Sequence, residues 1–106
     1  MLLRAAWLVV GACLATSALA GDAAAGRQRA ATCVVCHGPL GLATLPDAPH
    51  LAGQSAIYVA AQLKAYRDGG RRHEVMSLMA KPLSDADIDD LATWYASLKI
   101  QVQPVP

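Results

Sequence analysis

Residues 33–37 read Cys33-Val34-Val35-Cys36-His37, and they are the most specific pattern in the chain. Two thiols three residues apart, followed at once by an imidazole, form the pattern by which haem is attached covalently to a polypeptide. Each thiol can add to one vinyl group of the haem, and His37 then lies beneath the iron as the proximal ligand. The sequence therefore predicts one covalent haem c, bound through Cys33 and Cys36, with His37 on its iron.

Two other chemistries use similar residues. A Cys-x-x-Cys redox disulfide normally follows a strand in a βαβ setting, and no strand signal precedes Cys33. A zinc site needs a fourth ligand besides Cys33, Cys36 and His37, which His50 or His73 could supply. Haem remains the preferred interpretation.

The second axial ligand has four candidates, Met76, Met79, His50 and His73. Each is separated from His37 by enough chain to reach the other face of a haem. Met76 and Met79 are three residues apart and share a face of any short helix, so periodicity does not choose between them. The residues alone favour a thioether ligand but leave its position open.

Helix signals surround the motif, and no strand signal occurs anywhere. Asp22 is a suitable N-cap for a helix that runs to about Thr32. Residues 37–53 have three prolines and three glycines without a period, which is typical of a loop. Helices are predicted over 56–68, which Gly69 and Gly70 end, and from Ser84 to Lys99, with one or two turns over 74–80. This pattern predicts an all-α fold.

The first twenty residues form an export signal. Arg4 precedes an apolar run over 5–15, and Ala18-Leu19-Ala20 fits a cleavage site, so residues 1–20 are predicted to be a signal peptide cut after Ala20. The apolar run is shorter than the roughly 20 residues that span a bilayer. An alternative is lipoprotein processing before Cys13. Export by this route predicts a periplasmic location.

Charge and size exclude several classes of protein. The chain has 106 residues, and once Arg4 is set aside eight basic residues balance eight acidic ones, which argues against nucleic acid as a partner. One domain is expected over 21–100, with a flexible tail over 101–106. So short a chain, padded with Ala, needs a cofactor to complete its core. Six aliphatic residues are expected to line that cofactor: Leu40, Leu42, Leu51, Ile57, Leu83 and Leu91.

From Gly21 to Leu98 the chain resembles the class I c-type cytochromes of the single-domain cytochrome c4 or c-553 kind. The resemblance is carried by Gly21-Asp22, Ala25-Gly26, Cys33 to Gly38, Pro49 to Gln54, Tyr58, Gln62-Leu63, Tyr66-Arg67, Gly69, Met76, Leu83 to Asp85, Asp87-Ile88, Leu91-Ala92 and Trp94-Tyr95. It implies a small cytochrome c fold of three to four short helices wrapped around one covalent haem. It also implies Met76 as the distal ligand, seven residues before Leu83, and a Pro49 carbonyl that accepts the Nδ1–H of His37. Cytochromes c4 have two such domains, whereas this chain has one.

The same resemblance implies a periplasmic mono-haem carrier of single electrons in a respiratory or related chain, not an enzyme. Transient redox-protein donors and acceptors are expected, with Lys64, Arg67, Arg71 and Arg72 as candidates for the rim of the docking face. No small-molecule substrate is expected, and membrane contact is expected only through partner complexes. The alternatives are the haem c subunit of a periplasmic dehydrogenase and, with an open iron position, a sensor or peroxidase.

Overall fold

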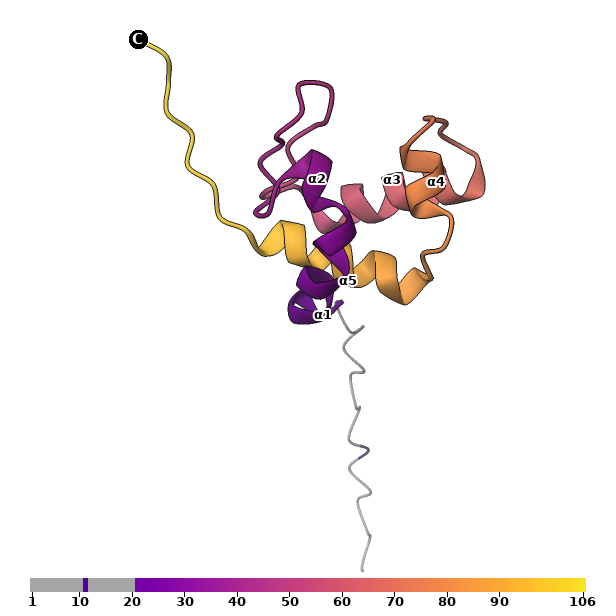
Figure 1. The fold of residues 1–106 in the computed structure, drawn as a ribbon. Helices are drawn as coiled ribbons and strands as arrows, with labels where there is room; N and C mark the ends of the chain where they lie inside the picture. The colour runs from indigo at the N-terminus through magenta and orange to yellow at the C-terminus, as the bar shows by residue number, and fades with distance from the viewer. Residues whose placement is uncertain (1–10, 12–20) are drawn as a thin grey trace, which may run out of the picture.

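The structure is a computed structural model that describes Gly11 and residues 21–106. It has no strand in those residues, so the all-α prediction is confirmed (Figure 1). The predicted signal peptide, Ala20 and Cys13 included, lies outside the described residues apart from Gly11. The elements follow one another as α1 (Ala23–Arg29), the 3-10 helix η1 (Ala30–Thr32), α2 (Val34–His37), α3 (Ala56–Asp68), α4 (Met76–Ala80) and α5 (Asp85–Ser97).

Helix α1 begins where the sequence predicts, because the Asp22 carboxylate accepts hydrogen bonds from the backbone N–H groups of Ala24 at 2.9 Å and Ala25 at 3.3 Å. The helix then tightens into η1, which ends at Thr32. The single turn α2, which contains Cys36 and His37, was not predicted as a helix. Its four residues carry no periodic pattern from which it could be recognised.

The two longer helices, α3 and α5, begin after the residues that the sequence predicts as caps. The Ser55 hydroxyl caps α3, and Gly69 ends it in the left-handed conformation at φ 88°. In front of α5, Ser84 and Asp87 form a capping box in which each side chain accepts a hydrogen bond from the other residue's backbone N–H. Both helices therefore start and stop for local reasons that are visible in the sequence.

The helices α1 and α5 pack closely because Gly26 has no side chain. A Cβ at Gly26 would collide with the carbonyl oxygen of Asp90 and would lie 2.8 Å from the Cβ of Trp94. A second link between the helices is the ion pair of Arg29 with Asp87, at 2.8 Å. The N-terminal helix is thereby fixed on α5, which places the turn that follows it.

The core is small and lies along α5. Four of its residues are buried there: Ile88, Leu91, Ala92 and Tyr95. Ala30 packs against Leu91 and Tyr95, with half-buried Leu51, Leu63 and Leu83 around them. Burial raises the pKa of the Tyr95 hydroxyl above its ordinary value.

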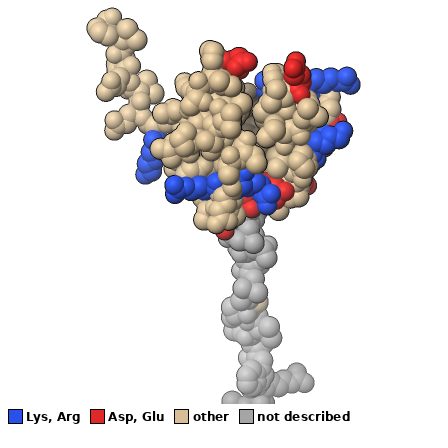
Figure 2. Space-filling model, viewed as in Figure 1, with Lys and Arg blue, Asp and Glu red and all other residues tan. Residues whose placement is uncertain are grey.

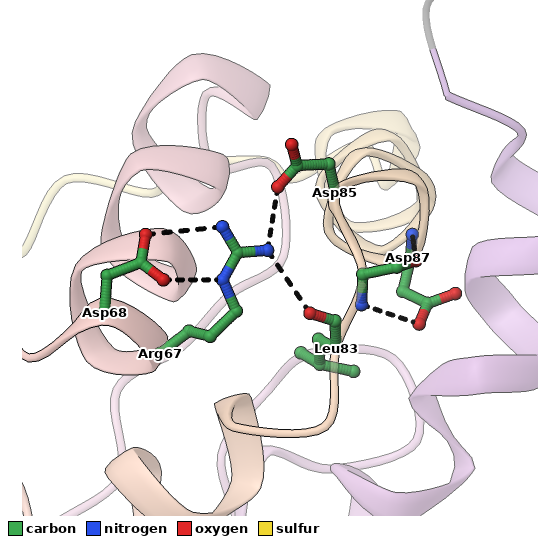
Figure 3. Close-up of polar contacts among 6 residues, drawn as sticks. Arg67, Asp68, Leu83, Asp85 and Asp87 are labelled. Carbon is green, nitrogen blue, oxygen red and sulfur yellow. Dashed lines mark hydrogen bonds and ion pairs between the residues drawn. The ribbon is translucent and has the colours of Figure 1, made fainter.

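Arg67, near the end of α3, links that helix to the start of α5 (Figure 3). Its guanidinium donates to Asp68 at 2.8 Å, to Asp85 at 2.7 Å and to the backbone carbonyl of Leu83 at 3.2 Å. The contact with Leu83 holds the short connection that joins α4 to α5. The chain just after α4 is thus anchored to α3.

The C-terminal residues 101–106 are exposed and extend away from the helices (Figure 1). None of the described helices is long and apolar enough to cross a membrane.

Candidate cofactor site

The turn α2 places the Cys-Val-Val-Cys-His motif at the surface of a cavity. Cys33 is the N-cap of α2, while Cys36 and His37 lie within the turn. Both thiols are free and half-buried. His37 is the one polar residue among the buried side chains of the described chain, with 7% of its surface exposed.

The cavity has a volume of about 580 Å³ and reaches Cys33, Cys36 and His37. This volume is within the roughly 300–1,000 Å³ range of sites that enclose small ligands. Its walls come from α2, the 38–55 loop, α3, α4 and α5. They are largely apolar, and they include Leu51, Val59, Leu63, Leu83 and Leu91. Two free thiols and a buried imidazole that border one apolar cavity are what a covalently bound haem needs.

The orientation of His37 is set by the loop that follows it. Its Nδ1 lies 2.9 Å from the carbonyl oxygen of Pro49, which is the contact that the family resemblance implies. A carbonyl can only accept, so Nδ1 carries the hydrogen and the lone pair of Nε2 is free to bind a metal. The loop is fixed by the Gly41 carbonyl, which accepts from the backbone N–H groups of Leu51 at 2.7 Å and Ala52 at 3.0 Å.

The other two histidines also line the cavity, but their Nδ1 atoms accept hydrogen bonds where Nδ1 of His37 donates one. The Nδ1 of His50 accepts from the backbone N–H of Ala43 at 2.8 Å. The Nδ1 of His73 accepts from the backbone N–H groups of Val75 at 3.1 Å and Met76 at 3.2 Å. A neutral imidazole whose Nδ1 accepts carries its hydrogen on Nε2, which leaves no lone pair for iron. Of the three histidines, His37 therefore suits a metal best.

Both methionines of α4 reach the same cavity as the motif. Met76 is half-buried and Met79 is 38% exposed. Thioethers from α4 and the imidazole of α2 thus border one space, although the two elements are far apart in sequence. The choice of Met76 over Met79 stays a prediction.

The prediction of six aliphatic residues that line the cofactor is only partly correct. Leu51, Leu83 and Leu91 line the cavity, but Leu40, Leu42 and Ile57 do not. Those three are exposed by 53%, 57% and 84%. The prediction was wrong for them because it relied on residue type within a loop, or at the first turn of a helix, where no period shows which way a side chain points.

The basic residues of 64–72 have different environments. Arg67 is occupied by Asp68, Asp85 and Leu83, as described above. Arg71 lines the cavity, where it donates to Gln62 at 2.7 Å and lies 4.7 Å from the centre of the Tyr66 ring. In Figure 2, Lys and Arg atoms gather over the connection between α3 and α4, to the right of the view. The sequence analysis named Arg71 as a candidate for the rim of the docking face, and the structure places it among the lining residues of the cavity.

Residues 21–106 contain no group of three or more His, Cys, Asp or Glu side chains whose arrangement could hold a metal ion. What they hold instead is an all-α fold, two free thiols and one imidazole at an apolar cavity. These features define the class of small proteins that bind haem covalently.

The chain belongs to the cytochrome c family, whose model matches residues 23–99. The resemblance to class I c-type cytochromes and the small cytochrome c fold are therefore confirmed. Membership also implies the covalently bound haem c with its iron, and the described thiols, imidazole and apolar walls fit that group. Proteins of this family carry electrons and interact with redox partners.

Among curated proteins, cytochrome c-554(548) of Halomonas halodenitrificans is 51% identical over 81 residues, covering 74% of this chain and 98% of the relative. The thiosulfate dehydrogenase electron acceptor of Thiomonas intermedia is 47% identical and cytochrome c4 of Pseudomonas aeruginosa 43% identical, each over 78% of this chain. The chain spans only 39% and 41% of the length of those two relatives.

The solved structures that match this chain include the same kinds of protein as the sequence relatives. Reduced recombinant cytochrome c4 from Pseudomonas stutzeri matches with a TM-score of 0.71 at 39% identity, over 76% of this chain and 47% of that one. Thiosulfate dehydrogenase (TsdBA) from Marichromatium purpuratum matches with a TM-score of 0.69 at 37% identity, over 74% of this chain and 20% of that one.

Proposed function

We propose that this protein is an exported mono-haem carrier of single electrons in a respiratory or related chain. Cys33 and Cys36 would hold the haem through two thioethers, and His37 and Met76 would supply the imidazole and the thioether that bind its iron. The observation that carries the proposal is the single apolar cavity that meets both thiols, the imidazole of His37 and the α4 methionines.

The chain's own residues have distinct tasks in this function. When bound, the haem supplies one reversible electron through its iron. The Pro49 carbonyl fixes the ring of His37 and its tautomer. Leu51, Leu83 and Leu91 keep water from the cavity, which limits reorganisation when the charge of the site changes. If His37 and Met76 both bind the iron, no position on it stays open for a substrate, and the haem would then transfer electrons without catalysing a reaction.

Binding of carbon monoxide to the reduced holoprotein tests this proposal. A carrier whose iron has two protein ligands binds the gas slowly, because Met76 must leave first. The haem should nonetheless reduce and reoxidise fully with one electron. Rapid binding of carbon monoxide to the wild-type protein would instead establish an open iron, as in a sensor or peroxidase.

A second candidate is the haem c subunit of a periplasmic dehydrogenase. It is favoured by the similarity to a protein named thiosulfate dehydrogenase electron acceptor. Co-purification distinguishes the two functions, since a subunit elutes with a larger catalytic chain whereas a free carrier elutes alone. Partners approach the rim of the cavity, where Arg71 and Tyr58 lie.

The periplasmic location is part of the proposal and rests on residues 1–20. Mass spectrometry of the protein from a periplasmic extract should give a chain that begins at Gly21 and carries one haem. A lipid-modified chain that begins at Cys13 would replace cleavage after Ala20 with lipoprotein processing.

A further inference from the structure

His73 is bonded to the turn that leads into α4. Besides accepting from the N–H groups of Val75 and Met76 through Nδ1, it donates its own backbone N–H to the Ser77 hydroxyl at 3.0 Å. Its carbonyl accepts from the N–H of Ser77, also at 3.0 Å. One residue thus satisfies three backbone N–H groups at the start of a helix.

This matters because α4 has little else to hold its first turn. The helix has five residues, and its N-cap, Val75, offers no side-chain hydrogen bond. So short a helix is not stable by itself, and its first N–H groups need acceptors. Val75 is 46% exposed and the preceding residues 69–74 are exposed, so little packing fixes this entrance.

The chain that follows α4 is fixed by a different residue, Arg67. Arg67 donates to the Leu83 carbonyl three residues after α4 ends. Among the described residues, the segment 75–83 is therefore hydrogen-bonded to α3 at its end, and at its start the acceptors of its backbone N–H groups come from His73. Loss of the His73 acceptor should loosen the entrance, which is where Met76 stands.

We propose that His73 is a positioning residue for Met76: its Nδ1 accepts the N–H of Met76 and so holds the thioether of that residue at the iron. The proposal rests on the proposed function, in which Met76 is the distal ligand. It also gives His73 a task other than ligation, because its Nε2 carries the hydrogen. His73 is exposed, so its substitution leaves the core intact.

The test compares His73→Leu with His73→Asn in the ferric holoprotein. Leu removes the acceptor, while the amide oxygen of Asn can accept the same N–H groups as a cap. The measurement is the rate at which added imidazole replaces the distal ligand. We expect about a fivefold increase in His73→Leu, the factor that corresponds to the typical loss of a helix cap, and a rate within about twofold of the wild type in His73→Asn.

A wild-type rate in His73→Leu overturns the proposal, and so do equally fast rates in both variants. The wild-type ferric spectrum separates this failure from a failure of the proposed function. If the sulfur-to-iron charge-transfer band is absent from the wild type, Met ligation itself is wrong and both proposals fall. If the band is present and His73→Leu behaves as the wild type, only the positioning role of His73 is wrong.

Discussion

At the scale of single residues, hydrogen bonds at Nδ1 distinguish three histidines of the same type. In His37 this atom donates to a carbonyl, whereas in His50 and His73 it accepts from backbone N–H groups. The motif alone predicted a role for His37, because its position after Cys36 is specific. Sequence could not separate His50 from His73 as ligands, since their tautomers depend on backbone groups placed by loops without periodicity.

Asp87 gives a prediction about acid stability. The hydrogen bond from the Ser84 backbone lowers the pKa of Asp87 below its ordinary value of 3.8. Because the folded pKa is the lower one, the charged carboxylate stabilises the fold above about pH 4 and this contribution is lost as the pH falls further. Asp87→Asn should therefore be less stable than the wild type at pH 7, and the difference should close as the pH falls below 3.8 and through the lower pKa of the folded state.

Chemical unfolding of the holoprotein at several pH values measures this difference. Asp89→Asn is the matched control: it lies on the same helix, and the Asp89 carboxylate makes no hydrogen bond within residues 21–106. A gap between wild type and Asp87→Asn that stays constant from pH 7 to about pH 3 would contradict the assignment.

At the scale of elements, helix ends were predictable and the small turns were not. Asp22, Ser55 and Ser84 are local caps whose partners lie within three residues, so α1, α3 and α5 begin where expected. Turn α2 is held partly by Thr44, which bonds to the carbonyls of Val35 and Cys36 from outside it. Such contacts between distant residues have no signature in a single sequence.

The contact of α1 with α5 predicts an unusual response to Gly26→Ala. Ala is favoured over Gly inside a helix by about 1 kcal/mol, so propensity alone predicts stabilisation. The added Cβ would collide with Asp90, and we expect instead a loss of about 1–3 kcal/mol in the free energy of unfolding.

Denaturant titration of the holoprotein checks the sign of this change. Gly70→Ala is the control, because a Cβ there meets its nearest atom at 3.9 Å, and its effect should stay within about 0.5 kcal/mol. A Gly26→Ala protein more stable than the wild type would show that the helices are not in close contact.

At the scale of the whole molecule, the fold is arranged around a cavity and not around a continuous core. The buried apolar residues of the described chain are seven, and three of them are Ala. The shortage of large buried apolar side chains was predictable from length and composition, and it is the reason why a cofactor is expected to complete the interior. Leu91 on helix α5 was correctly predicted to line the cavity, but residue type alone did not separate Leu51, which lines it, from Leu40 and Leu42 in the same loop, which do not.

The double substitution Cys33→Ala with Cys36→Ala tests the need for the cofactor. Without thioethers the cavity of about 580 Å³ loses its occupant, and the mature chain should be largely unfolded. Circular dichroism of the purified variant should show little of the wild-type helix signal and no cooperative thermal transition. A fully helical apoprotein that melts cooperatively would mean that the polypeptide folds without haem.

The most direct test of the account is the ferric near-infrared spectrum of the wild type beside Met76→Ala and Met79→Ala. An electron carrier with His37 and Met76 on its iron should show the sulfur-to-iron charge-transfer band in the wild type and in Met79→Ala, and lose it in Met76→Ala. A wild-type spectrum without the band would contradict the closed carrier. Survival of the band in Met76→Ala and its loss in Met79→Ala would move the ligand to Met79.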